Sequence, residues 1–566
     1  TGVKNVLIGG LTGDALTTGS NNTAIGYGAL STEDAHGGNT AIGSRALYTL
    51  DAGADAWNIA IGYEAGIAMS TGVRNTIVGS YAGDALTAGD YNVAIGYAAL
   101  STEDAHGYNV AIGPNALYAL DAGAHAYNVA VGYDTGKALT TGIRNTLIGT
   151  SAGDALTTGN YNVAVGYNAL GAEDTQGRNV AIGYDCLVQL NAGADAYNVA
   201  VGFGSGGALT TGVQNTFMGG DVADSLVSGD SNVAMGYNAM GAANGSESRN
   251  VAIGATALQT MDSDASNYNT AVGYAAGAAV TTGIDNVILG GLAGDALTTG
   301  SYNVAIGKSA LSTEDAHGRN VAIGYGALYG QDAGQDAYNV AIGFNAGVSV
   351  STGTQNTIIG GLTGDALTTG HYNVAIGGSA LSTEDGHGKN VAIGYTALYA
   401  QNAGANAYNV AVGYAAGAAV TTGTANTIIG GNAGDAFTTC SYNTAIGYNA
   451  LSAEDAHGVN VAVGSNALKV QDAGAEGNNV AVGHDAGKAV STGVQNTILG
   501  SKTGDALTTG ENNIVIGYNA AASAVDVDNE ITLGDANIDA FRCNDQSIAA
   551  LSDGRDKSDV KDSGFG

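Results

Sequence analysis

The chain is poor in proline, in cationic residues and in large aromatic side chains. Of its 566 residues one is Pro, one is Trp, six are Phe and five are Met. Collagen needs abundant proline and glycine at every third position, so it is excluded. Only 17 residues are Lys or Arg against 50 Asp or Glu, which gives a formal net charge of -33. We therefore expect neither nucleic acid nor an anionic membrane surface as a partner, because both need clustered cations.

Cysteines and long apolar runs are scarce as well. Cys186, Cys440 and Cys543 lie far apart with no paired spacing, so we expect neither a disulfide framework nor a zinc site. No run of 18 apolar residues occurs, so we expect no membrane insertion. The chain is nevertheless 45% hydrophobic, which argues against disorder, and it holds 92 Gly and 29 Tyr. Small apolar residues with many glycines favour a thin, repetitive β structure around a narrow core.

An internal repeat runs through the sequence. The motif Asn-x-Ala-x-Gly and its variants occur thirty times from Asn5 to Asn513, with spacings of 17, 17, 19 and 17 residues that recur. Four repeats therefore make a longer unit of about 70 residues. This period is too short for a pair of helices and is close to one coil of a β-solenoid. We predict an all-β fold, a parallel β-roll or β-solenoid of about thirty coils over residues 1–527.

Each repeat has the same order of residues, for which Asn92–Gly96 is typical. Val93 and Ile95 point to one side of a short strand and Ala94 to the other. Both sides are apolar, so we expect Val and Ile to fill the coil and the Ala side to pack against a second layer. Gly96 predicts a tight corner with positive φ, and the repeated Asn predicts a ladder of side-chain amides. Burial of the Ala side between chains predicts a parallel homotrimer.

The repeated coil resembles a known family. The segments NVAIG, NTAIG and NVAVG are similar to the head repeats of trimeric autotransporter adhesins. The resemblance covers about residues 1–520. It implies a left-handed parallel β-roll with three chains side by side, that is, a parallel homotrimeric fibre.

A second resemblance lies at the C-terminal end. Residues 529–557 hold ITLG, FRC and SDGRDK segments, and together they resemble the junction before the self-cleaving intramolecular chaperone of phage tail fibres and spikes. The resemblance implies a neck over 528–551 and the beginning of a chaperone domain over 552–566. It also implies one self-cleavage at Ser552-Asp553, with Lys557 as the activating residue. Fourteen residues follow Ser552, so the chaperone domain is expected to be truncated or absent.

The loop STEDAHG gives a candidate metal site. Glu103, Asp104 and His106 lie in one copy, and Asp121 holds the position of Asp104 on the next coil. If coils stack in register, the two aspartates come close, and Ca²⁺ or another divalent cation would relieve their repulsion. The alternative is a solvated acidic loop that recurs only because the longer unit was duplicated. No other cofactor is expected.

Two further repeated features have structural and functional interpretations. The GDAL segments, such as Gly83-Asp84, resemble calcium-binding β-rolls but lack their glycine spacing, so we predict a turn. Tyrosines before the repeated Asn and after the Gly, such as Tyr91 and Tyr97, either stack on sugar rings or form a structural ladder. The repeats contain no catalytic constellation, so we expect no enzyme apart from the one self-cleavage; a capsule depolymerase is a third, less favoured possibility.

These observations and resemblances together predict a virion fibre. We expect a phage tail fibre or similar surface appendage that serves host attachment. Its partners would be its own copies, baseplate, tail or capsid proteins of the particle, and a glycan or protein of the host surface. The alternative is a bacterial trimeric adhesin or extracellular filament subunit located on the cell surface.

Overall fold

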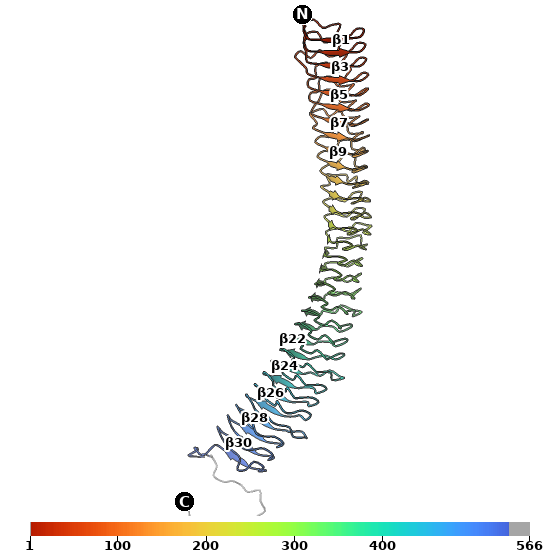
Figure 1. Ribbon diagram of the computed structural model, residues 1–566. Helices are drawn as coiled ribbons and strands as arrows, with labels where there is room; N and C mark the ends of the chain where they lie inside the picture. The colour runs from red at the N-terminus through yellow and green to blue at the C-terminus, as the bar shows by residue number, and fades with distance from the viewer. Residues whose placement is uncertain (1, 541, 543–566) are drawn as a thin grey trace, which may run out of the picture. The chain divides into compact units, whose positions relative to one another are not determined.

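The computed structural model describes residues 2–540 and 542 (Figure 1). Ser552, Asp553 and Lys557 lie outside the described residues, as do Cys543 and the whole of 552–566. The described part is all-β, and it contains no helix that could span a lipid bilayer. The chain divides into two compact units, Thr1–Thr424 and Ala425–Gly566, which are described separately.

Each coil contributes one strand of three residues. The first unit holds β1(Val6–Ile8), β2(Thr23–Ile25), β3(Thr40–Ile42), β4(Ile59–Ile61), β5(Thr76–Val78), β6(Val93–Ile95), β7(Val110–Ile112), β8(Val129–Val131), β9(Thr146–Ile148), β10(Val163–Val165), β11(Val180–Ile182), β12(Val199–Val201), β13(Thr216–Met218), β14(Val233–Met235), β15(Val251–Ile253), β16(Thr270–Val272), β17(Val287–Leu289), β18(Val304–Ile306), β19(Val321–Ile323), β20(Val340–Ile342), β21(Thr357–Ile359), β22(Val374–Ile376), β23(Val391–Ile393) and β24(Val410–Val412). The second unit holds β25(Thr427–Ile429), β26(Thr444–Ile446), β27(Val461–Val463), β28(Val480–Val482), β29(Thr497–Leu499), β30(Ile514–Ile516) and β31(Ile531–Leu533).

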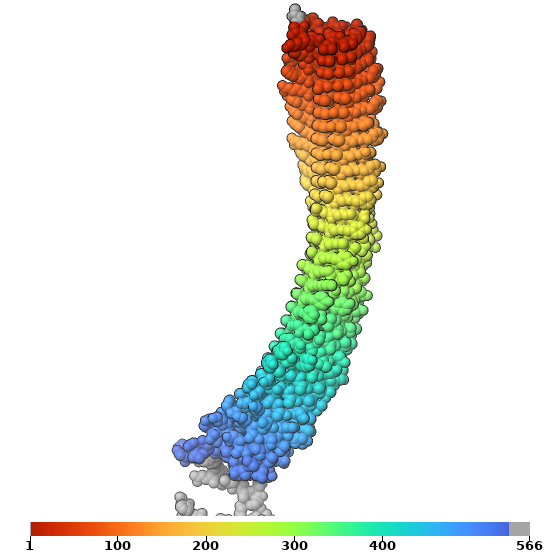
Figure 2. All heavy atoms as spheres, viewed as in Figure 1, coloured from red at the N-terminus to blue at the C-terminus, as the bar shows by residue number. Residues whose placement is uncertain are grey.

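Within each unit the strands stack parallel and in register. Val93, Ala94 and Ile95 of β6 pair with Val110, Ala111 and Ile112 of β7, and the same pattern repeats along the stack. Figure 2 shows the coils of each unit as successive layers in direct contact. The predicted β-solenoid is confirmed. The ITLG segment adds a coil that the Asn motif does not mark, because β31 pairs in register with β30.

The side of each strand that faces the interior is the opposite of the one expected from the sequence. Ala94 is fully buried, whereas Val93 and Ile95 are only half-buried, and most strands of the solenoid show this pattern. The expectation that the Ala side faces another chain is therefore wrong. The reason is the width of the coil: Ala99 and Leu100 enter the interior from the opposite side, which leaves room for a methyl group only. The branched side chains consequently face outward.

One strand in four carries a larger central residue, and glycines make room for it. Ile77 of β5 is fully buried where its neighbours have Ala. A Cβ on Gly66 or Gly83 would lie 3.2 or 3.3 Å from Cδ1 of Ile77, and both glycines stand where other coils have Leu. Large and small residues thus alternate between the two sides of the coil, which keeps a narrow core filled. The same exchange explains the Ala-Gly pairs of the repeat.

A buried ladder of asparagines connects the coils. The backbone N–H of Asn92 donates to Oδ1 of Asn75 at 2.8 Å, and that of Asn109 donates to Oδ1 of Asn92 at 3.0 Å. The Nδ2 of Asn92 donates to the backbone oxygen of His106 at 3.1 Å. From Asn22 to Asn513 these residues are at most 1% exposed. The predicted ladder is confirmed, and it runs through backbone groups as well as side chains.

The corner after each strand requires glycine. The thirty corner glycines of the repeat have φ between 121° and 144°, a region that side chains rarely adopt. A Cβ on Gly96 would lie 2.5 Å from the carbonyl carbon and oxygen of Gly113 on the next coil. The corner therefore fixes both the turn and the close spacing of successive coils.

Replacement of this glycine tests the corner. We expect Gly96→Ala to lower the local stability of the adjoining coils by about 3 kcal/mol, through backbone strain and contact with the next corner. Hydrogen exchange should quicken in β6 and β7. Gly361→Ala is the control, because nothing lies within 4 Å of a Cβ there. Equal exchange in both variants would contradict the steric account.

Candidate functional site

Five loops of the solenoid place a buried glutamate beside a histidine. These are the loops of Glu33, Glu103, Glu314, Glu384 and Glu454, and each of these glutamates is fully buried. Oε1 of Glu103 accepts a hydrogen bond from the backbone N–H of His106 at 3.0 Å. Its Oε2 accepts another from the backbone N–H of Ala122, on the next coil, at 3.3 Å. The glutamate thus closes its own loop and connects it to the neighbouring loop.

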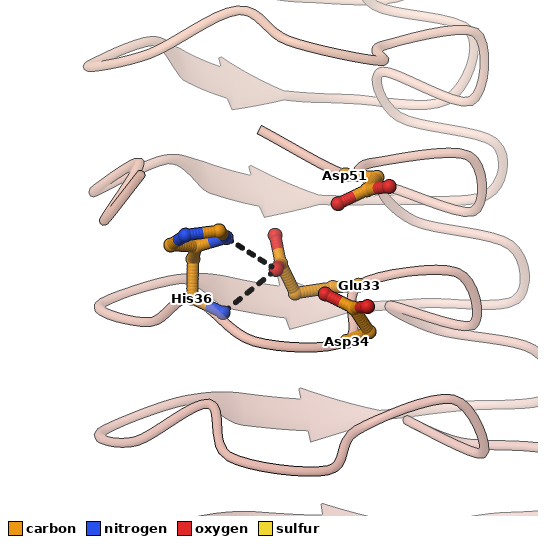
Figure 3. Close-up of side chains that lie close together, drawn as sticks. All are labelled: Glu33, Asp34, His36 and Asp51. Carbon is orange, nitrogen blue, oxygen red and sulfur yellow. Dashed lines mark hydrogen bonds and ion pairs between the residues drawn. The ribbon is translucent and has the colours of Figure 1, made fainter. Parts of the chain in front are cut away.

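The side chains of these loops form groups of metal-binding type. In the first loop Glu33, Asp34, His36 and Asp51 each offer one ligand atom, and these atoms lie within 4.8 Å of one another. Figure 3 shows the Glu33 carboxylate between the His36 imidazole on one side and the two aspartates on the other. Nδ1 of His36 lies 3.5 Å from Oε1 of Glu33.

The predicted metal residues come together in part. Glu103, Asp104 and His106 form one such group, whereas Asp121 is not a member of it. Asp51, which holds the position of Asp121 in the first copy of the longer repeat, does join its group. Sequence reasoning found the loop and the residue types but missed the complete burial of the glutamate. The spacing Glu-x-x-His is the signal for it, because that spacing lets the carboxylate accept the backbone N–H three residues later.

Burial raises the pKa of several buried glutamates of the solenoid. It raises the pKa of Glu314 and of Glu454 to about 7, because the carboxylates are removed from water. Backbone N–H groups of His317 and His457 oppose the rise. The pKa values of Glu103, Glu173 and Glu384 are also raised, again mainly by burial. The carboxyl groups of Glu314 and Glu454 therefore ionise less readily in the folded chain than in water.

The aspartates of the GDAL segments have a structural partner. Oδ1 of Asp365 accepts a hydrogen bond from Oγ of Ser382 at 2.6 Å, which connects the turn to the next coil. Asp14 and Ser31 repeat the contact at 2.5 Å. The segment forms a turn, as the sequence indicates.

The exposed tyrosines form ladders along the solenoid. The rings of Tyr91 and Tyr108 are stacked with centroids 5.1 Å apart, and those of Tyr108 and Tyr127 follow at 5.2 Å. Arg144 extends such a column by donating from Nη1 to the hydroxyl of Tyr161 at 2.7 Å. A ring stacked on both sides offers its edge rather than a free face, so these contacts favour the structural interpretation over sugar stacking.

Two other features bear on chemistry. The second unit has a hollow of about 700 Å³ lined by Lys469, Lys488 and Lys502 together with two aspartates. Cys186 and Cys440 are buried free thiols, and burial raises the pKa of each to about 12, so neither is a reactive thiolate at neutral pH.

No model of a known protein family matches the chain, and a search of curated proteins finds no significant match.

The buried glutamates predict an unusual dependence of stability on pH. Because the folded pKa of Glu314 is about 7 and its ordinary value is 4.5, the folded chain holds a proton that the unfolded chain has lost between these values. This contribution to stability is present below pH 4.5 and is lost as the pH rises to about 7. His317, Asp315 and Asp332 are the titratable groups around it.

We expect the melting temperature in EDTA to fall between pH 5 and pH 7.5. The double variant Glu314→Gln, Glu454→Gln should flatten this fall, because an amide does not ionise. Glu476→Gln, which removes an exposed carboxylate, is the control. A double variant with the full wild-type slope would contradict the account.

Proposed function

We propose that the chain is a structural fibre protein, the shaft of a virion appendage such as a phage tail fibre, and that it serves host attachment as a parallel homotrimer. The supporting observation is the outward row of branched apolar side chains. On most coils two such residues, the first and third of each strand, are only half-buried. A solenoid that repeats the same uncharged row on every coil is suited to pack against copies of itself.

The extent of this row is greater than a monomer normally exposes. The first unit has 24 strands. At roughly 20 to 30 Å² of exposed area per side chain, its row is larger than the few hundred Å² that a contiguous apolar patch on a monomer usually covers. The acidic loops lie elsewhere on the coil, so copies meeting through the strands would not bring those charges together. A second and a third copy of the chain are therefore the occupants we propose for this face.

The length of the solenoid and the presence of several fibres on one particle would suit attachment to a host surface. At about 4.8 Å per coil, the 24 coils of the first unit span roughly 110 Å. A stiff element of that length holds a binding function away from a particle, and several fibres on one particle add avidity. The resemblance of residues 529–557 to the tail-fibre junction favours a virion over the alternative of a bacterial surface adhesin. The lysine-lined hollow of the second unit offers the strongly acidic chain a place to contact an anionic host glycan.

The oligomeric state tests the proposal. The chain has a mass of 55.5 kDa, and light scattering after size exclusion should report about three times that mass. Ile61→Glu, Val131→Glu and Val201→Glu together should give monomers, because three charges enter the row.

The matched control adds the same three charges to exposed loop positions, as Ala54→Glu, Ala124→Glu and Ala194→Glu. It should remain trimeric. A monomeric wild-type chain, or strand variants that stay trimeric, would overturn self-association through this face. Immunogold labelling of phage particles and of bacterial cells is a separate test, which distinguishes a virion fibre from a bacterial adhesin by its location.

A further inference from the structure

In each of the five loops that pair a buried glutamate with a histidine, the imidazole Nδ1 is buried and has no hydrogen-bond partner. We propose that each loop binds one first-row divalent transition cation, of which Zn²⁺ is the probe, through the carboxylate of the buried glutamate, the imidazole Nδ1 and the neighbouring aspartate. The sites belong to the loops of Glu33, Glu103, Glu314, Glu384 and Glu454.

Buried atoms without partners point to a ligand in the first loop. Glu33 is fully buried, and its Oε2 has no hydrogen-bond partner. Nδ1 of His36 is also buried and has no hydrogen-bond partner. A buried polar atom without a partner carries a desolvation cost of about 1 to 3 kcal/mol, and more when it is charged. Two such atoms in one group are best explained by something that binds both.

The separation of the donor atoms suits a shared cation. Nδ1 of His36 lies 3.5 Å from Oε1 of Glu33, and the corresponding distance in the second loop, between His106 and Glu103, is 3.4 Å. These distances are long for a hydrogen bond. Two ligands bound to Zn²⁺ at 2.0 to 2.1 Å in tetrahedral geometry lie roughly 3.3 Å apart. The observed pairs need to move little to bind one ion.

The donor set selects the kind of cation. Oxygen-only sites suit Ca²⁺ and Mg²⁺, whereas an imidazole nitrogen suits Zn²⁺ and its neighbours. Asp34 and Asp51 are exposed, so the first group extends from the buried Glu33 to the solvent, which gives an ion a path of entry. A dication would also reduce the repulsion among three carboxylates.

The chain contains natural departures from this pattern. In the third copy of the loop Gln176 replaces the histidine, while its backbone N–H still donates to Oε1 of Glu173 at 3.2 Å. The fold of the loop thus survives without the imidazole. In the fourth copy the carboxylate of Glu247 accepts hydrogen bonds from the backbone N–H groups of Gly245 and Ser263, both at 3.0 Å. We therefore expect five sites in seven copies.

These departures provide matched variants for the test. The full-length chain is freed of metal with EDTA, dialysed against micromolar ZnCl₂ and analysed for bound zinc by mass spectrometry. We expect five Zn²⁺ per chain, four for His106→Gln and six for Gln176→His. His484→Gln, which alters a histidine outside these loops, should retain five. Circular dichroism checks that every variant is folded, and Gln176 already shows that the loop accepts glutamine.

The outcomes separate a metal site from a simple ion pair. Ca²⁺ in place of Zn²⁺ should bind at least tenfold more weakly. The proposal is overturned if the wild-type chain binds no zinc at micromolar concentration. It is equally overturned if His106→Gln and Gln176→His leave the stoichiometry unchanged, because the histidine and glutamate would then form only a local ion pair.

Discussion

One hydrogen bond, repeated on nearly every coil, holds the solenoid in register: the backbone N–H of each ladder asparagine donates to the side-chain oxygen of the asparagine before it. Asn75, Asn92 and Asn109 show the pattern at 2.8 and 3.0 Å. The side-chain nitrogen of most ladder residues donates at the same time to a backbone oxygen, as Asn92 does to that of His106. Buried amides must find partners or cost stability, so each coil accepts the next in one register only. The corner glycine at Gly96 then permits the close spacing that these bonds need.

The sequence predicts the architecture well because the architecture is periodic. The spacing of Asn92 from Asn75 and Asn109 shows the coil length, and the alternation around Ala94 shows a strand. Periodicity does not show which side of the strand faces inward. Val93 and Ile95 are the larger apolar residues, so they are expected inside, but the interior width is set by Leu100 from the opposite side of the coil. That contact is invisible until the chain is folded, and it moves the proposed interchain face from alanine to valine and isoleucine.

In the acidic loops, too, the sequence does not show which side chains are buried. Glu103 and Asp104 are adjacent carboxylates in one polar segment, and nothing in their composition separates them. The structure buries the first and exposes the second. Burial follows from hydrogen bonds to His106 and Ala122, one local and one on the next coil. The Glu-x-x-His spacing indicates the local bond, but only the stacked coils supply the other. A loop that composition describes as solvated thus also connects two coils through a buried carboxyl group.

The solenoid therefore has three kinds of surface: an uncharged strand face that we propose packs against copies of the chain, ladders of exposed tyrosines, and acidic loops that we propose bind cations. All three depend on coils that stay in register. Hydrogen exchange of the Asn92→Ala variant, read at the backbone amide of Asn109, tests this dependence most directly, with exposed Asn191→Ala as the control. The account predicts that exchange at Asn109 quickens about 10- to 100-fold, because a buried donor loses its acceptor. Unchanged protection of that amide in a folded Asn92→Ala variant would contradict it.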